Sequence, residues 1–380
     1  MPLEAADVFR RFGPGYIERF GGAMLPSHRR AIEDITGCRT EAMGGQVWHC
    51  PDCDRDVYVY HGCRNRSCPS CHTRQRREWL AARRAETLPC GYFHVTVTIP
   101  EELREPFRSN QKDAYGLLMA VAAGAVTELC RDLKHLGGTP GILSVLHTWT
   151  GRMDYHPHVH MLVTAGGFGA DRESWMPSKP DFLVPVKALS RLARHRMREA
   201  LEKNCPDLMK TIPAGVWKKE WVANILPWSG GPDAVLTYLA RYAHRIAITS
   251  ARLLAMDDTH VTFRWKDRKG NRWRTCRVTG EEFLRRFLQH VLPKGFHKVR
   301  YHGLWHPSNR TLAARVRQCL LLAVVAAATA KVFAGKKETT GTMEAADTNG
   351  EAPGFTRCPH CGGQRLEYVG LLERPRNRSP

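Results

Sequence analysis

The chain has 380 residues, of which 43% are hydrophobic and 25% are charged. This composition is typical of a folded protein and excludes a disordered or fibrous chain, and the length allows two or three domains. Lysine and arginine outnumber aspartate and glutamate by 57 to 37, which gives a formal net charge of +20. A charge of this sign and size favours a polyanionic partner, and nucleic acid is the partner that we expect.

Residues 1–30 lack the apolar core of a secretory signal, and the longest apolar run, residues 319–328, is too short to span a membrane. We interpret this run as a buried helix, and the sequence therefore predicts a soluble, cytoplasmic protein. Its thirteen cysteines are then expected to be thiols or metal ligands rather than disulfides.

The predicted elements combine helices with β-branched strands. A helix is expected at 7–20 and a basic helix at 72–86, and the alternating sequence YFHVTVTI at 92–99 predicts a strand. A helix at 112–136 precedes a strand pair at 142–149 and 156–164, and helices at 186–204 and 232–245 follow. Two further strands, 259–265 and 272–278, flank a turn that contains Gly270. Helices at 280–292 and up to Phe333 complete a fold of the α+β class.

These elements suggest four regions. Residues 1–88 would form a cysteine-rich domain, residues 89–255 a domain of strands and helices, and residues 256–334 a C-terminal region with a β-hairpin and helices. Residues 335–380 form a linker and a small CxxC knuckle, because residues 335–356 are polar and lack periodicity, which is typical of a flexible segment.

Two CxxC pairs lie near the N-terminus, Cys50 with Cys53 and Cys68 with Cys71. Each pair offers two thiolates from one tight turn, so two such turns complete a tetrahedral zinc site without an open position, as in structural zinc sites. The alternative ligands are Cys63, His49, His61 and His72. A third pair, Cys358 and Cys361, provides half a site, which His360 and another donor or a partner's half-site would complete.

Arginines are frequent around the second CxxC pair and along the helix that follows it. An arginine-rich surface on a zinc-bound module suits contact with phosphates. The arginines that we expect to contact DNA in this region are Arg64, Arg66, Arg74, Arg76 and Arg77, with Arg83 and Arg84 extending the basic face.

Three histidines, His156, His158 and His160, alternate at the start of an apolar strand, and this period of two places them on one face. Residues 151–154 have the sequence of a turn, so the two strands should pair as a hairpin with His147 opposite His158. His147, His158 and His160 would then form a metal site with open positions for a substrate, and imidazoles suit Zn, Mn, Fe or Ni. His156 is the alternative to His147 as the third ligand.

Tyr238 and Tyr242 are four residues apart on the predicted helix 232–245, so their hydroxyls lie on one face, and Arg241, His244 and Arg245 surround them. A tyrosine phenol, with a pKa of about 10, becomes a useful nucleophile when a metal polarises a phosphate and neighbouring cations stabilise the phenolate. A phosphotyrosine link conserves the energy of the broken phosphodiester, and two tyrosines permit two successive transfers.

Five blocks of the sequence, in this order, carry a resemblance to a known family: CRNRSCPSC, FHVTVTIP, LHTWTGRMDYHPHVHMLVTAGGF, YLARYAHRIAIT and FLQHVLPKGFHKVRYHG. They resemble the rolling-circle transposases of the insertion-sequence-91 type, two-tyrosine members of the HUH (His-hydrophobic-His) superfamily of single-strand DNA nucleases. The resemblance extends from about Cys38 to Asn309. Where many members have a histidine this chain has Ser67, which favours an all-cysteine zinc site.

The resemblance implies that residues 1–88 are a zinc-binding domain that contacts DNA. It also implies that residues 89–255 are an HUH tyrosine nuclease domain, in which helices flank an antiparallel sheet. It implies His158 and His160 as ligands of a catalytic Mg²⁺ or Mn²⁺, which His147 would join in the geometry above. It also implies Tyr238 and Tyr242 as nucleophiles. Attack by one tyrosine would leave a 5′-phosphotyrosyl protein and a free 3′-hydroxyl. The implied partners are single-stranded ends of its own insertion sequence and target DNA, in a bacterial protein associated with the nucleoid.

Two other functions agree with parts of the sequence. A plasmid or phage replication initiator, or a relaxase, uses the same chemistry, but the zinc module and the block FLQHVLPKGFHKVRYHG favour the transposase. A zinc-finger DNA-binding regulator without catalysis accounts for the charge and the CxxC pairs, but it leaves the histidine strand and the tyrosine helix unexplained.

Overall fold

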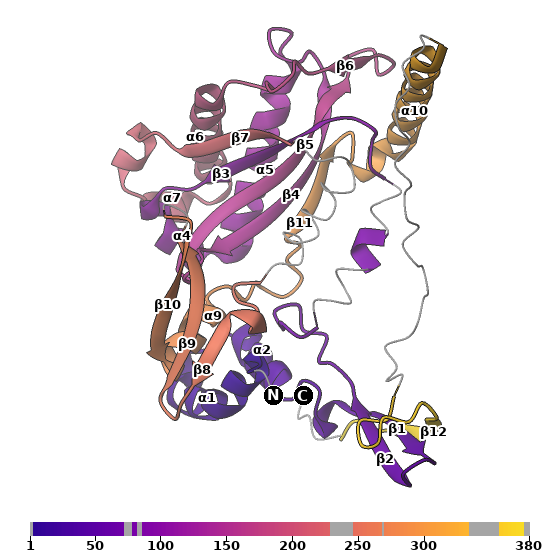
Figure 1. Ribbon diagram of the computed structural model, residues 1–380. Coiled ribbons are helices and arrows are strands. Elements are labelled where there is room, and N and C mark those ends of the chain that lie inside the picture. The colour runs from indigo at the N-terminus through magenta and orange to yellow at the C-terminus, as the bar shows by residue number, and fades with distance from the viewer. Residues whose placement is uncertain are drawn as a thin grey trace.

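The computed structural model describes residues 3–71, 78–81, 86–228, 246–267, 270–333 and 357–375. Its described strands form three antiparallel sheets that are accompanied by helices (Figure 1), which confirms the predicted α+β class. Several predicted features lie outside the described residues, namely the linker 335–356, the helix 232–245, and the side chains His72, Arg74, Arg76, Arg77, Arg83, Arg84, Tyr238, Arg241, Tyr242, His244 and Arg245.

The largest sheet has the strand order β11–β4–β5–β3–β7, with β6 paired to β5. Its strands are β3 (Tyr92–Thr98), β4 (Thr139–Trp149), β5 (Tyr155–Phe168), β6 (Trp175–Pro177), β7 (Val222–Trp228) and β11 (Val299–Gly303). The first three confirm the strands predicted from alternating apolar residues. Strands β6, β7 and β11 were not predicted, because they are short or have mixed polarity.

Four of the described helices pack on one face of this sheet. They are α4 (Arg104–Ser109), α5 (Gln111–Arg131), α6 (Val186–Asn204) and α7 (Pro206–Lys210) (Figure 1). Their apolar side chains share a core with Val95, Val159 and Met161 of the sheet. Because successive strand residues point to opposite faces, His158 and His160 lie on the other face. By length and composition α5 could cross a membrane, but half of its apolar stretch is buried, as in the core helix of a folded domain.

The N-terminal helices pack against residues from the second half of the chain. Helices α1 (Ala5–Phe20) and α2 (Pro26–Thr36) share a core with β8 (Leu253–Met256), β9 (His260–Asp267), β10 (Arg272–Thr279) and α9 (Gly280–Leu288). In this core the rings of Phe9 and Phe287 meet edge to face, with centroids 4.9 Å apart. This core thus combines residues from the predicted regions 1–88 and 256–334. The hairpin of β9 and β10 confirms the predicted turn at Gly270.

A third sheet joins the two ends of the chain. Strand β1 (Gly45–Cys50) pairs with β2 (Arg55–Tyr60) on one side and with β12 (Glu367–Leu372) on the other. Figure 1 shows β12, in yellow, beside the indigo strands β1 and β2. None of these strands was predicted, because each is six residues long and carries no extended apolar alternation.

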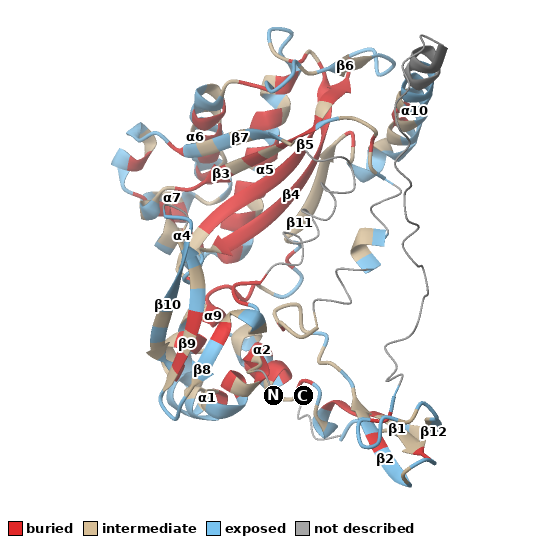
Figure 2. Ribbon diagram, in the orientation of Figure 1, coloured by how far each residue is buried: buried red, intermediate tan, exposed pale blue. Residues whose placement is uncertain are grey.

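Helix α10 (Arg310–Phe333) corrects the expectation of a buried helix at 319–328. In its first turns Leu312 and Val316 are buried and pack with Leu88 and Leu304. Farther along, the side chains of the apolar run are largely exposed, and Leu322 is 69% exposed. Figure 2 shows this contrast between α10 and the buried strands β4 and β5. The expectation was wrong for the described part of the run, because an apolar composition does not itself supply a surface to pack against.

Candidate functional site

Three histidines meet on the face of the largest sheet opposite α5 and α6. The ligand nitrogens of His147, His158 and His160 all lie within 4.8 Å of one another. His147 is paired with His158 in the β4–β5 ladder, which confirms the predicted register. Each of the three side chains is at most 9% exposed. Buried imidazoles need polar partners or a bound ion, so this cluster is a candidate metal centre.

Hydrogen bonds orient two of these rings. His158 Nδ1 lies 2.6 Å from the carbonyl oxygen of His156, so this nitrogen carries the proton and donates it to the carbonyl. His160 Nδ1 lies 2.9 Å from His94 Nε2 and 3.3 Å from Thr96 Oγ1. Histidines that bind metals characteristically use the second ring nitrogen in this way. With Nδ1 engaged, Nε2 is the nitrogen that each ring would offer to an ion.

Sequence reasoning missed His94, although a signal was present. His94 and Thr96 are alternate residues of β3, and Thr96 is directly opposite His160 in the β3–β5 ladder. The strand YFHVTVTI therefore places two polar side chains on the same face of the sheet as the histidine cluster. A strand that is apolar on one face and polar at two positions on the other indicates a neighbouring polar site.

His156 does not join the cluster. Its Nδ1 lies 3.1 Å from Arg104 Nη2, and since a guanidinium can only donate, this nitrogen is the acceptor. The geometry thus places His147, and not His156, beside His158 and His160.

The neighbouring end of the β4–β5 hairpin is held by α9 and the turn after it. Trp149 stacks on His147, with ring centroids 4.5 Å apart. His290 Nε2 lies 3.1 Å from the carbonyl oxygen of Met153, and its Nδ1 lies 3.1 Å from the hydroxyl of Thr148. Burial lowers the pKa of His290 to about 4. The ring is therefore neutral, donating from Nε2 and accepting at Nδ1. It holds Thr148 and Met153, which precede and follow Trp149 in the hairpin.

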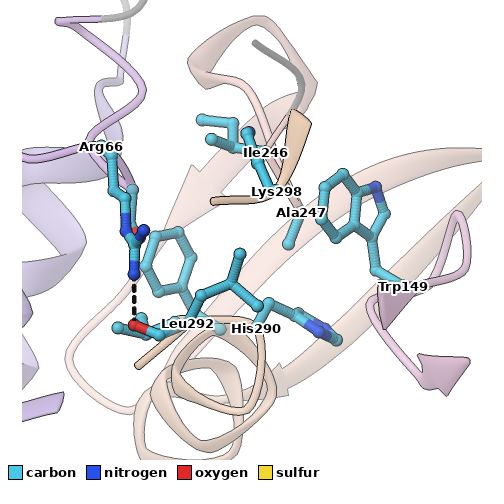
Figure 3. Close-up of a pocket in the computed structure, with 10 residues that line it drawn as sticks. Arg66, Trp149, Ile246, Ala247, His290, Leu292 and Lys298 are labelled. Atoms are coloured by element: carbon cyan, nitrogen blue, oxygen red, sulfur yellow. Dashed lines mark hydrogen bonds between the residues drawn. The ribbon is translucent and has the colours of Figure 1, made fainter. Parts of the chain in front are cut away.

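A small cavity adjoins Trp149 (Figure 3). Its volume of about 30 Å³ suits one or two water molecules and is too small for a nucleotide base. Ile246 and Ala247, the first described residues after 229–245, line it together with Lys298. Burial, with a smaller contribution from Arg66, lowers the pKa of Lys298 to about 8. The wall of this cavity thus carries a lysine that loses its proton more easily than an exposed one.

Arg66 has a different role from the predicted one. Its Nη1 donates to the carbonyl oxygen of Phe296 at 2.7 Å, and its Nη2 lies 2.6 Å from the carbonyl oxygens of both Leu292 and Pro293. Figure 3 shows the hydrogen bond to Leu292. These bonds direct the guanidinium into the protein, so the geometry does not support the expected phosphate contact. Arg64, two residues earlier, is exposed. The other predicted DNA-contacting arginines lie outside the described residues.

The described cysteines form two clusters of four, and neither is the predicted one. Cys68 and Cys71 meet Cys38 and Cys63, whereas Cys50 and Cys53 meet Cys358 and Cys361. The single site predicted from Cys50, Cys53, Cys68 and Cys71 is therefore not formed. Cys50 and Cys53 are at the tip of the β1–β2 hairpin, and the six residues of β2 carry the chain about 20 Å away from that tip.

The first cluster lies where the N-terminal helices meet the rest of the protein. Its Sγ–Sγ distances are 3.6 Å for Cys38 and Cys68, 3.7 Å for Cys38 and Cys71, and 3.8 Å for Cys63 and Cys71. Asn65, between these cysteines, donates to the carboxylate of Asp34 on α2 at 3.0 Å. The segment 63–71 is thus tied to α2 by Asn65 and to the turn 292–296 by Arg66. His49, an alternative ligand, instead lies 3.0 Å from the carboxylate of Asp56.

Comparisons with known proteins agree with this arrangement. Residues 141–312 match a family model described as a putative transposase, and residues 8–99 match a transposase zinc-binding domain. The putative transposase y4qJ of Sinorhizobium fredii (strain NBRC 101917 / NGR234) is 38% identical over 97% of this chain and 96% of its own length. The chain belongs to the transposases of the insertion-sequence-91 type.

A further relative of this transposase is the transposase for insertion sequence element IS801 of Pseudomonas savastanoi pv. phaseolicola. It is 25% identical over 74% of this chain and 71% of its own length. No solved structure matches the chain. Transposases act on DNA, so DNA is a partner, and the zinc-binding domain with its cysteine clusters supports structural zinc. Cys358 and Cys361 lie outside both matched regions.

Proposed function

We propose that this transposase cuts and rejoins single-stranded DNA through a 5′-phosphotyrosine link during rolling-circle transposition of an insertion sequence. The observation that carries the proposal is the convergence of His147, His158 and His160 on the face of the sheet opposite α5 and α6. A regulator that only binds DNA has no need of three buried imidazoles at this distance. Tyr238 and Tyr242 lie in the region 141–312 that matches the transposase model.

The three histidines fit a divalent cation. Their ring nitrogens lie on adjacent strands, and two of the rings are held by hydrogen bonds at their second nitrogen. We propose Mg²⁺ or Mn²⁺ as the ion, and of the two Mn²⁺ better suits imidazole ligands. When bound, the ion supplies Lewis-acid polarisation of a phosphate oxygen.

The tyrosines provide the nucleophile in this proposal. The phenol oxygen of Tyr238 or Tyr242 attacks the phosphorus of one phosphodiester and loses its proton to solvent. A bond forms between the phenol oxygen and phosphorus, and the bond from phosphorus to the 3′-oxygen breaks. The departing 3′-oxygen takes up a proton and becomes a hydroxyl. Arg241 and Arg245 lie close in sequence and would stabilise the phenolate and the phosphate.

The first cysteine cluster supports this function structurally. With a Zn–S bond of about 2.3 Å, a regular tetrahedron has sulfur atoms about 3.8 Å apart. The observed distances of 3.6 to 3.8 Å among Cys38, Cys63, Cys68 and Cys71 agree with this value. We propose that zinc at this cluster fixes the segment 63–71 and presents the exposed Arg64 to DNA phosphates.

The experiment that tests the proposal uses labelled single-stranded oligonucleotides that tile both flanks of the transposase gene. The purified protein is incubated with them in Mg²⁺, Mn²⁺ or EDTA, and cleavage is followed on denaturing gels. Cleavage should require the metal. His147→Ala, His158→Ala and His160→Ala should each abolish it while DNA binding, measured by gel shift, persists.

His156→Ala is the matched control, because His156 is on the same strand but outside the cluster. This variant should retain cleavage. Cleavage that persists in EDTA or in the His160→Ala variant would contradict a metal-dependent mechanism. Binding without cleavage of any oligonucleotide by the wild-type protein would instead support the DNA-binding regulator.

A further inference from the structure

The second cysteine cluster joins residues from opposite ends of the chain. Cys50 Sγ lies 3.7 Å from Cys361 Sγ, and Cys53 Sγ lies 3.8 Å from Cys358 Sγ. All four sulfur atoms lie within 4.8 Å of one another. These distances match the edge of a zinc tetrathiolate, about 3.8 Å, and far exceed a disulfide bond of about 2.05 Å.

Both pairs are presented by tight turns of the kind that hold zinc ligands. Cys50 ends β1, and the backbone N–H of Cys53 lies 3.3 Å from the carbonyl oxygen of Cys50. In the C-terminal pair, the N–H groups of His360 and Gly363 lie 3.4 Å from Cys358 Sγ and Cys361 Sγ, respectively. Such donors favour the thiolate form that a metal ligand needs.

Contacts outside the cysteine cluster also join the C-terminal segment to the N-terminal hairpin. Strand β12 pairs with β1 from His49 opposite Glu367 to Gly45 opposite Leu372. Next to this ladder Gly44 has φ of 65°, and a Cβ atom there would lie 2.6 Å from the carbonyl oxygen of Leu372. Asp52, between the first two cysteines, accepts a hydrogen bond from Arg365.

We propose that Cys50, Cys53, Cys358 and Cys361 bind a second structural zinc ion, which fastens the C-terminal segment to the N-terminal hairpin. Four sulfur donors leave no open position, so the ion is structural. Three short strands bury few apolar side chains, and among the described residues Val57 is the buried aliphatic side chain of their core. Metal binding therefore supplies the stability that this packing lacks. The hairpin of the zinc-binding domain is then complete only when the far end of the chain is present.

Metal counting on the full-length protein tests this proposal first. Elemental analysis by mass spectrometry after exhaustive dialysis should give two zinc ions per chain. The double variant Cys358→Ser with Cys361→Ser should retain one, because the cluster of Cys38, Cys63, Cys68 and Cys71 is intact. The control Cys319→Ser, on exposed α10, should retain two. Unchanged zinc content in the double variant, iron in place of zinc, or a Cys50–Cys361 or Cys53–Cys358 disulfide in the protein as isolated would overturn the proposal.

A second experiment is independent of how the double variant folds. A specific protease site is introduced at residues 339–345 of the otherwise wild-type chain, and the purified protein is cut there. The fragment that contains residues 357–375 should co-elute with the remainder of the protein on size exclusion and be released by a strong chelator. Its release without chelator would show that the metal does not hold the two ends together.

Discussion

His94 Nε2 lies 2.9 Å from His160 Nδ1, which connects strand β3 to the member of the histidine cluster that β5 carries next to it. The two rings are nearly parallel, with centroids 5.0 Å apart. A hydrogen bond at Nδ1 fixes the orientation of the His160 ring and so the direction in which its Nε2 points. His94 is therefore a positioning residue for the candidate metal centre, and it does not need to touch the ion itself.

Replacing His94 should weaken metal binding and spare the rest of the site. His94→Ala should lower the affinity for Mn²⁺ about 10- to 100-fold, as loss of a hydrogen-bond partner of a metal-binding histidine does elsewhere. Titration of the protein with Mn²⁺, followed by electron paramagnetic resonance, measures this change. Cleavage should recover at saturating Mn²⁺. The control is His195→Ala, because His195 is exposed on α6, on the opposite face of the sheet. Equal Mn²⁺ affinities in the two variants would show that His94 does not orient the site.

Arg66 and Arg64 should separate stability from DNA binding. Arg66→Ala removes the donors to three carbonyl oxygens and should lower the free energy of unfolding by about 2–4 kcal/mol, measured by urea denaturation. Arg64→Ala should change stability by less than about 0.5 kcal/mol. It should instead weaken binding to single-stranded DNA. The slope of the logarithm of the binding constant against the logarithm of the salt concentration should become shallower by about one. The reverse pattern would restore Arg66 as the DNA contact.

His290 should make the protein less stable in mild acid. Its pKa is lowered to about 4 in the fold by burial, whereas the unfolded chain binds a proton with a pKa of about 6.5. Between these values the unfolded state holds more protons, so stability is full above pH 6.5 or so and falls as the pH drops towards 4. At pH 5.5 the loss from this group is about 1.4 kcal/mol.

Urea denaturation at pH 7.5 and 5.5 measures this dependence. The His290→Gln variant should lose that part of the difference in unfolding free energy, while the exposed-site control His195→Gln should keep the wild-type difference. An unchanged pH dependence in His290→Gln would show that this histidine is not held neutral by the fold.

The sequence predicts well where local pattern decides the structure. Alternating residues define β4 and β5, and the short turn between them sets the register that brings His147 opposite His158. It fails where distant segments supply the partner. The CxxC pairs suggest a site with each other, but the three-stranded sheet brings Cys358 and Cys361 to Cys50 and Cys53, over more than 300 residues. Likewise, the charge of Arg66 suggests phosphate, and only the fold shows three carbonyl oxygens around it.

The most direct test of the proposed function identifies the residue that carries the DNA. The protein is incubated with Mn²⁺ and an intact oligonucleotide of a sequence that it cleaves. The covalent product is then digested with nuclease and trypsin, and the peptides are analysed by mass spectrometry. The peptide 220–241 contains Tyr238 and the peptide 242–245 contains Tyr242, so the two candidates separate. The account predicts a nucleotide on one or both tyrosines and no adduct in the double variant Tyr238→Phe with Tyr242→Phe. An adduct that persists in this variant, or one on any other residue, would contradict it.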